Sequence, residues 1–237
     1  MTFDSRPNSR APADVAAALE RARYEHRGNV DDVGYGVWGL SFASGDVLAF
    51  RRFPPTAHTP GYTCVWHRSP DGLWTFYADV GEGRGCHRHF GPCVDQLIVT
   101  PIRVEWTGPF RVMVTIDGGR KLSWSVVLTS SLATTVTGAC LRLVPRHAWG
   151  DDRAVRILAV LTAVPLRMAR LPLAGRAPSG DHFLLRPLAL WRISASRASV
   201  LGRDLGPLTE TSEAAALGEF VIPRTGLFVV GGAQVCA

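Results

Sequence analysis

The chain has 237 residues, of which 46% are hydrophobic and 19% are charged. This composition excludes a disordered chain and a coiled coil. The net charge of +6 does not indicate a nucleic-acid partner, because the basic residues are scattered and no basic stripe alternates with stacking aromatic side chains. The length predicts one large domain or two small ones.

The five cysteines are irregularly spaced, which does not suit a disulfide framework. The first residues lack the charged and apolar stretches of a secretion signal, and no run of about 18 apolar residues occurs. We therefore expect a cytoplasmic protein with reduced thiols and no stable insertion into a membrane.

Residues 1–33 are predicted to form an N-terminal tail and a helix. Residues 1–12 are rich in Ser, Pro and Arg, which is typical of a loose terminus. In residues 13–27 the apolar side chains recur at spacings of three and four, which predicts the helix. No linker divides the remaining residues 34–237, so we expect them to form a single domain.

Between residues 35 and 129 the apolar side chains alternate with a period of two, which predicts β-strands. The turn dipeptide Asp71–Gly72 between two aromatic-rich strands indicates a hairpin. Because the connections are short, the strands suit an antiparallel meander rather than βαβ units. The predicted strands are residues 36–42, 47–53, 61–67, 73–77, 102–106, 110–116 and 122–128.

A pair of helices is predicted to interrupt the strands at about residues 131–170, and strands then resume. The fold class is therefore mainly β (α+β): an antiparallel sheet curled into a barrel with an inserted helical pair. The helices are expected at residues 131–143 and 151–169, the strands at 171–174, 182–188, 190–195 and 198–201, a short helix at 209–216, and a final hairpin of residues 220–222 and 227–230.

The second inserted helix is apolar on nearly every face, and Pro165 is expected to kink or end it. Asp151 or Asp152 can cap its N-terminus. One interpretation is a helix buried in the fold. The alternatives are a lid over an apolar cavity or a surface that contacts lipid, with Arg153, Arg156, Arg167 and Arg170 at its ends.

Aromatic side chains are concentrated in the predicted hairpin of residues 61–77, and both of its faces are partly apolar. A half-solvated strand would have one clearly polar face. The hairpin is therefore either a core strand covered on both sides or the wall of a barrel cavity that holds one small ligand. On the second interpretation the ligand-binding residues are Trp38, Tyr62, Trp66, Trp74, Trp106 and Trp124.

Three ionisable residues are candidates for moving a proton: His67, Tyr77 and Glu105. His67 could act near neutral pH if the hairpin places it beside Tyr77 and Asp79, although a histidine near a turn is equally compatible with solvent exposure. Glu105 would have a raised pKa and act as an acid if it points inward, and would be an ordinary solvated residue if it points outward.

The segment from Cys86 to Cys93 holds two cysteines and two histidines, His87 and His89, within eight residues. Their spacing does not match the standard zinc patterns, so we predict no metal. The glycines of residues 81–85 lack the strand-to-helix context of a nucleotide site, and no motif for a cofactor occurs. We therefore expect no cofactor.

The aromatic strands resemble those of lipocalin-like barrel proteins of the carotenoid 1,2-hydratase type and of uncharacterised proteins of high-GC bacteria. The resemblance lies in Gly34–Tyr35–Gly36–Val37–Trp38, in Trp66, in Trp74–Thr75–Phe76–Tyr77 and in Val104–Glu105–Trp106–Thr107–Gly108–Pro109, within roughly residues 34–129. The chain is shorter than a two-barrel hydratase, and no hydratase catalytic residue can be placed on it. The resemblance implies a lipocalin-like barrel with a cavity for a hydrophobic molecule. Related barrels include cofactor-free cyclases of natural-product pathways.

Two functions follow as hypotheses. The first is a cofactor-independent cyclase, isomerase or hydratase that folds a polyene, polyketide or isoprenoid against aromatic walls and moves a proton. The second is a carrier or sensor that binds the same lipophilic ligand without chemistry. A peripheral membrane protein that docks through residues 151–170 is a third hypothesis, and a homodimer is left open.

Overall fold

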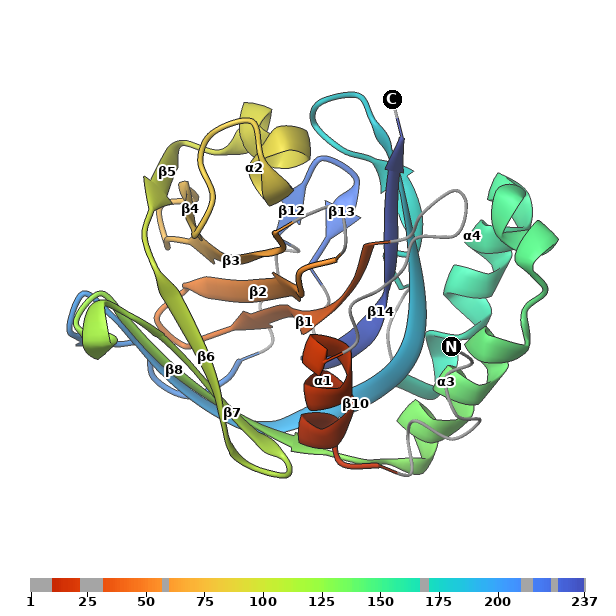
Figure 1. Cartoon of the computed structure of the whole chain (residues 1–237), viewed down its shortest axis with the longest axis horizontal. Helices are drawn as coiled ribbons and strands as arrows, with labels where there is room; N and C mark the ends of the chain where they lie inside the picture. Colours follow the sequence, from red (N-terminus) through yellow and green to blue (C-terminus); the bar gives the residue numbers. More distant parts are fainter. Residues whose placement is uncertain are drawn as a thin grey trace.

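The computed structural model describes residues 10–21, 32–56, 60–166, 171–209, 215–222 and 226–236. Their main feature is a 12-stranded sheet that curls into a half-barrel (Figure 1). Along the sheet the strands follow the order β5 (Gln96–Val99), β4 (Trp74–Ala78), β3 (Tyr62–Arg68), β2 (Val47–Phe53), β1 (Asp32–Ser41), β14 (Leu227–Cys236), β10 (His182–Val200), β8 (Leu122–Thr129), β7 (Arg111–Ile116) and β6 (Ile102–Gly108). The prediction of a mainly β, barrel-like fold is confirmed.

Four short strands lie outside this order or apart from the sheet. β9 (Ala174–Arg176) and β11 (Arg203–Asp204) both pair with β10. β13 (Phe220–Val221) pairs with β12 (Ala216–Leu217). The expected hairpin between residues 220–222 and 227–230 is therefore wrong, because β14 instead lies between β1 and β10. Residues 210–214 of the expected helix 209–216 lie outside the described residues, and Ala216 belongs to β12.

The sheet is mixed rather than antiparallel throughout. β5 runs parallel to β4, because the chain crosses through α2 (Gly85–Phe90) and a 3-10 turn at Gly91–Cys93 before it pairs. A helical crossover of this kind returns the chain in the same direction, whereas a tight turn reverses it. The other strand pairs of the sheet are antiparallel. The expectation of a wholly antiparallel sheet is wrong for this one pair.

β10 is a single strand of 19 residues where the sequence predicts three short strands. It pairs with β14 along its first half and with β8 along its second. Register shifts occur between Pro187 and Ala189 and between Ile193 and Ala195. Such bulges bend a strand, and they accommodate a proline that cannot donate to the ladder. Polar and proline residues at the bulges interrupt the alternation of apolar side chains. The sequence therefore predicted three separate strands, although the strand continues.

The interior of the half-barrel is filled by side chains. Phe50, Trp124, Trp191 and Phe228 are fully buried there. The rings of Phe50 and Trp124 are centred 5.8 Å apart, and those of Trp191 and Phe228 6.0 Å apart. Interiors packed in this way leave few voids larger than a water molecule. The interior is therefore the main core of the protein.

Helix α1 (Pro12–Arg21) packs against this core through Val15, Ala16 and Leu19. The carboxylate of Glu20 holds the helix on the sheet, because it accepts hydrogen bonds from Tyr35 Oη at 2.9 Å and from Arg52 Nε at 2.9 Å. Residues 22–27 of the expected helix 13–27 lie outside the described residues.

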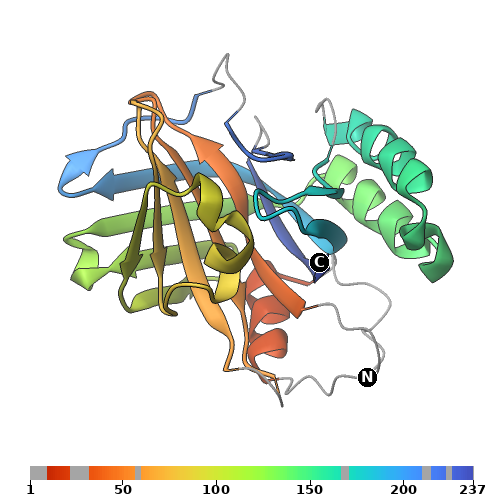
Figure 2. The ribbon, with the colours of Figure 1, turned by 90° about the horizontal axis from the view of Figure 1, so that it is seen from above.

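A helical hairpin of α3 (Leu132–Leu143) and α4 (Asp152–Leu161) stands beside the half-barrel and packs on β10 (Figure 2). Ser131 begins α3 in a capping box with Thr134, and Asp151 caps α4 by accepting from the backbone N–H groups of Arg153 and Ala154. The predicted insertion of a helical pair is confirmed. A 3-10 turn that contains Pro165 (Val164–Leu166) follows α4.

Helix α4 is buried on one side only. Val155 and Ala159 pack into a third core with Trp38, while Ile157 and Leu161 are more than half exposed. Among the described residues no helix has the length and apolar character needed to cross a bilayer.

Candidate functional site

A cavity of about 270 Å³ lies on the outer face of β2 and β3, not in the barrel interior. Helix α2, strand β13 and the ends of β10 and β14 form its other walls. Six aromatic side chains line it: Phe53, Tyr62, Trp66, Phe90, Phe183 and Phe220. Its polar lining comes from Arg51, Cys86, Arg88, His89 and Asp181. The hairpin of β3 and β4 thus faces the main core on one side, and a second core and the cavity on the other.

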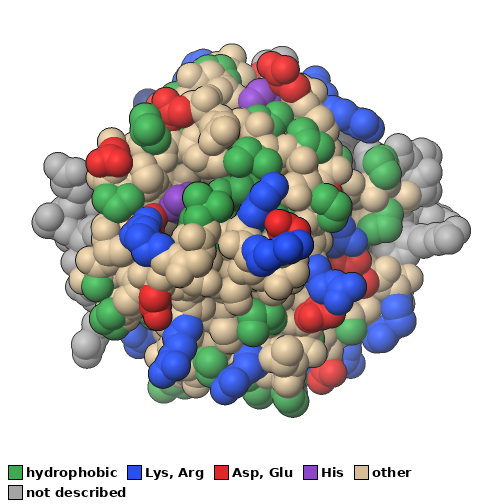
Figure 3. Space-filling view, turned by 90° about the vertical axis from the view of Figure 1, so that its left-hand side faces the viewer, with side chains coloured by type: hydrophobic (Ala, Val, Ile, Leu, Met, Phe, Trp, Pro, Cys, Tyr) green, Lys and Arg blue, Asp and Glu red, His purple; other side chains and the backbone are tan. Residues whose placement is uncertain are grey.

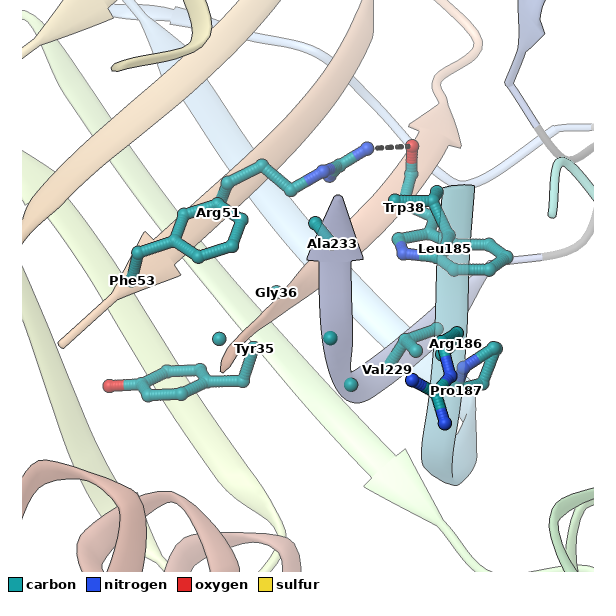
Figure 4. A pocket seen from close by; sticks show the side chains of 13 residues that line it. Tyr35, Gly36, Trp38, Arg51, Phe53, Leu185, Arg186, Pro187, Val229 and Ala233 are labelled. Atoms are coloured by element: carbon teal, nitrogen blue, oxygen red, sulfur yellow. Dashed lines mark hydrogen bonds between the residues drawn. The ribbon is translucent and has the colours of Figure 1, made fainter. Parts of the chain in front are cut away.

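Arg51 is placed in this wall by the alternation of β2. Val47 and Ala49 share its side of the strand and are buried in the outer core. The Arg51 side chain also borders a second, smaller cavity of about 50 Å³ between β1, β10 and β14 (Figure 4). The two cavities share Arg51, Phe53, Leu185 and Ala233. The guanidinium therefore stands between two hollow spaces.

The guanidinium of Arg51 is held by neutral partners. It donates to the carbonyl oxygens of Phe50 at 3.0 Å and Trp38 at 3.3 Å, and also to that of Val37. A β-bulge in β1 after Val37 interrupts the ladder with β2, next to these carbonyl groups. The centre of the guanidinium lies 4.6 Å from the ring centroid of Trp66 and 5.3 Å from that of Phe220. Both are cation–π distances.

Arg51 has no acidic partner among the described residues, although it is only 8% exposed. Burial lowers the pKa of Arg51 to about 10, and the neighbouring Cys86, Cys64 and Tyr62 partly oppose this shift. A pKa of about 10 keeps the side chain charged at neutral pH. The wall of the cavity thus contains a positive charge without a carboxylate to balance it.

A histidine–aspartate pair lines the same cavity. His89 lies on α2, and its Nδ1 is 2.7 Å from Asp181 Oδ2, which precedes β10. Ser179 Oγ donates to the same carboxylate oxygen at 2.7 Å. These two hydrogen bonds lower the pKa of Asp181, with that of His89 the stronger. Since Nδ1 is bound to the aspartate, Nε2 is the ring nitrogen left to meet a ligand.

The sequence predicted a loop where α2 forms. The helix begins at Gly85, which has a φ of +53° and lies so close to Tyr62 that a Cβ would stand 2.9 Å from its ring. Glycine permits both the positive φ and the close approach. Cys86 and His89 follow on the same helix, three residues apart, a spacing that places two side chains on one helix face.

Of the six predicted ligand-binding residues, Tyr62 and Trp66 line the larger cavity, and Trp38 lines the smaller one. The others lie elsewhere. Trp74 is buried in the outer core. Trp106 packs on Phe228 with ring centroids 5.6 Å apart, and Trp124 Nε1 donates to Ser196 Oγ at 2.9 Å in the main core.

The three predicted catalytic residues do not meet at the cavity. His67 is buried, and its Nε2 lies 2.7 Å from Asp46 Oδ1. Its strand neighbour on β4 is Thr75, whereas Tyr77 lies opposite Val65. Tyr77 is buried in the main core, and this burial raises its pKa. Glu105 is half exposed and pairs with Arg103 at 3.3 Å. Their catalytic role stays a prediction.

Sequence reasoning passed over Asp181 and Arg51, and it considered His89 only as a possible metal ligand. Arg51 had a usable signal, because it alternates with Val47, Ala49 and Phe53 on an otherwise apolar strand face. His89 and Asp181 had none, since they are 92 residues apart in the chain. In the described part of the chain no three His, Cys, Asp or Glu side chains converge to hold a metal. Cys86 is buried while Cys93 is exposed.

Positive, negative and apolar side chains are interspersed on the face of the molecule shown in Figure 3, without a continuous basic stripe. Comparison with known proteins gives no relative: no family model, curated protein or solved structure matches the chain. The cavity geometry therefore carries the functional argument alone.

Proposed function

We propose that the protein is a cofactor-independent acid–base enzyme, an isomerase, cyclase or hydratase, that acts on a small unsaturated molecule with an anionic group. The observation that carries this proposal is Arg51, a nearly buried cation on the cavity wall whose partners are carbonyl groups and aromatic rings. A buried charge is costly unless a counter-charge and hydrogen bonds compensate it. A ligand carboxylate beside Arg51 would provide both.

The cavity volume limits the size of the ligand. A cavity of about 150 Å³ is known to hold one benzene ring, and this cavity measures about 270 Å³. The cavity can therefore hold a molecule with one or two rings, but not an entire long polyene. The aromatic walls, which include Trp66, Phe90 and Phe220, favour a flat, unsaturated body that can stack or meet ring edges.

His89 and Asp181 supply the acid–base function. An aspartate that holds Nδ1 of a histidine orients the ring and leaves Nε2 to take or give a proton. Isomerisation, cyclisation and hydration of a double bond each need one proton moved at carbon. Confinement between the aromatic walls contributes by fixing a reactive conformer. No metal or redox group is required for such a reaction.

The carrier hypothesis is the second candidate, and the rigidity of the Arg51 site favours it. Three backbone carbonyl groups hold the guanidinium before any ligand binds, so binding alone would need no rearrangement. The lipocalin-like family suggested by the aromatic strands stays a proposal, supported by the half-barrel.

The test measures binding and proton transfer in the same samples. Cinnamate, sorbate and indole-3-acrylate are titrated against their neutral amides by the fluorescence of the protein, to which Trp66 contributes from the cavity wall. We expect the acids to bind about tenfold or more tightly, as a charged hydrogen bond allows. In D₂O, NMR should show deuterium entering a bound acid. Binding without exchange or conversion would favour the carrier, and no preference for acids would overturn both candidates.

A further inference from the structure

The cavity contains a nucleophile that the proposed function does not use. Cys86, near the start of α2, lines the cavity and is 7% exposed. Its Sγ lies 3.7 Å from Tyr62 Oη. Cys93, Cys140 and Cys236 are exposed elsewhere, and Cys64 is buried on β3. Cys86 is therefore the cysteine that a ligand in the cavity would meet.

The surroundings of Cys86 lower the pKa of its thiol. The hydrogen bond with Cys64 and the charge of Arg51 lower the pKa of Cys86 and outweigh the effect of burial. Burial instead raises the pKa of Cys64 well above its usual value. The indole Nε1 of Trp66 is buried without a hydrogen-bond partner in the described structure, and Trp66 also contributes to lowering the pKa of Cys86. Of the two thiols, Cys86 is therefore the one that gives up its proton more readily, and the charge of Arg51 stabilises the thiolate that forms.

We propose that Cys86 is the nucleophile of this cavity and adds reversibly to the β-carbon of an α,β-unsaturated acid whose carboxylate lies at Arg51. This inference rests on the proposed function and narrows its substrate class. Cys86 and His89 lie on one helix face and both line the cavity. The thiolate and the proton donor therefore reach the same double bond from the same side of the cavity.

The step balances without a further reactant. The proton of Cys86 passes to His89 Nε2, and the thiolate sulfur forms a bond to the β-carbon. The π electron pair moves to the α-carbon and the carboxylate, where Arg51 offsets the added charge. His89 Nε2 then protonates the α-carbon. In reverse, His89 removes the α-proton and the C–S bond breaks. Rotation about the single bond in the adduct makes the net reaction a cis–trans isomerisation.

Adduct formation gives the first test. The full chain is treated with trans-3-benzoylacrylate, which reports whether a thiol reaches a double bond next to a bound carboxylate. Its absorbance is lost when a thiol adds to the carbon β to the ketone, and each cysteine is assigned by peptide mass spectrometry. We expect the adduct first at Cys86, and about tenfold more slowly with the neutral trans-3-benzoylacrylamide. The exposed Cys93, Cys140 and Cys236 are internal controls that give the intrinsic ratio of acid to amide reactivity, which Cys86 should exceed. Equal acid preference at all four sites would overturn the proposal.

Variants separate this inference from the proposed function. Cys86→Ser should still bind the saturated 3-benzoylpropionate but lose cis–trans isomerisation, while Cys93→Ser should keep both. If Cys86→Ser isomerises as fast as the unaltered chain, the nucleophile is wrong and the proposed function stands. If the unaltered chain binds neither acid, the proposed function itself is overturned, and with it the substrate class assigned to Cys86.

A different observation carries a second inference, on the outer side of α4. Of the eleven large apolar side chains that are exposed in the described residues, seven lie on the helical hairpin and the turn after it. On α4 and this turn they are Ile157, Val160, Leu161 and Val164. Their spacing of three and four places them along one stripe. The exposed Arg153 and Arg156 lie on the same stripe, two turns and one turn before Val160, respectively.

We propose that this stripe, Ile157–Val160–Leu161–Val164, docks on an anionic lipid surface. Arginines beside an aliphatic stripe complement anionic headgroups. A second copy of the chain is a less suitable partner for this stripe, because a two-fold symmetric contact would place the arginines of the two copies next to each other, where they repel. A protein partner would be anchored by aromatic side chains more often than by leucine and valine, and this stripe has none.

Flotation with vesicles tests the stripe. We expect the chain to float with phosphatidylcholine vesicles that contain phosphatidylglycerol, and to be released by salt. Ile157→Ser combined with Leu161→Ser should abolish flotation. Leu201→Ser is the matched control, since Leu201 is 73% exposed in a turn outside the hairpin. Failure of the unaltered chain to float, or a dimer that the double variant dissociates, would overturn lipid docking.

Discussion

Two histidine–aspartate pairs of this protein have the same length and different surroundings. His67 Nε2 lies 2.7 Å from Asp46, and His89 Nδ1 lies 2.7 Å from Asp181. The first pair is buried beside a turn, and Asp46 also accepts from Arg203 Nη2 at 3.0 Å. The second pair lines a cavity and keeps about a fifth of each side chain exposed.

The difference shows that a histidine–aspartate contact acquires its role from what lies beside it. Arg203 balances the carboxylate of Asp46, and neither His67 nor Asp46 lines one of the two described cavities. The Asp181 pair faces the same cavity as Arg51, whose charge has no acidic partner in the described residues. We therefore interpret the first pair as support for the fold and the second as the acid–base group of the site.

The largest expected effect is on stability. Asp46→Ala should lower the free energy of unfolding by about 3–5 kcal/mol, because it removes a fully buried carboxylate that contacts both His67 and Arg203 and leaves His67 without its partner. Urea denaturation measures the change. Asp181→Ala is the matched control and should cost less, since its pair is partly exposed. Equal losses would contradict the distinction between the two pairs.

The second effect is on catalysis. His89→Gln should reduce deuterium transfer into a bound unsaturated acid by about 10²–10⁴-fold, as expected when an acid–base group is lost. The affinity for that acid should change little, because Arg51 provides its counter-charge. His67→Gln should leave the exchange rate of the folded protein unchanged. If both variants lose exchange alike, the two pairs do not differ in role.

Much of the fold follows from the sequence, because alternation and turn chemistry are local. The strands β1–β4 and β6–β8 and the helix α3 lie close to their predicted ranges, whereas α4 ends at Leu161, before the predicted end at residue 169. Local signals do not determine pairing, so the parallel β5 and the continuous β10 were missed. The site depends on pairing even more strongly. The aromatic side chains of residues 61–77 predicted a wall of the cavity. No local pattern, however, predicted the contact of His89 with Asp181, which is 92 residues away in the chain.

The next comparison is between Arg51, which lines the cavity, and Arg203, which pairs with Asp46. Arg51→Met should weaken binding of an unsaturated acid by about 10–100-fold, because the charged hydrogen bond is lost. Folding should be preserved, since an apolar side chain of similar volume often replaces a buried charge without loss. Arg203→Met should leave binding unchanged. Its half-exposed pair with Asp46 should contribute about 1 kcal/mol or less. Isothermal titration and urea denaturation measure the two effects.

Lowering the pH should destabilise the protein for the same reason as Asp46→Ala, but to a smaller extent. Burial would raise the pKa of Asp46, but the hydrogen bonds from Arg203 and His67 bring it below its ordinary value. A carboxyl with a lowered folded pKa stabilises the protein above its unfolded pKa, and this stability is lost as the pH falls through the folded value. The melting temperature should therefore fall below about pH 4. Asp46→Asn should flatten that fall, and an unchanged profile would contradict the assignment.

The smallest effect is expected at Glu105, and it tests whether this sequence-predicted acid is an ordinary solvated residue. Its side chain is 52% exposed and its partner Arg103 is 73% exposed. Exposed pairs of this kind contribute about 0.2–1 kcal/mol or nothing measurable. Glu105→Gln should therefore alter neither the urea midpoint nor the transfer of deuterium. A loss of exchange comparable to that of His89→Gln would move the chemistry to the edge strand β6, away from the cavity, and would favour Glu105 over the Asp181 pair.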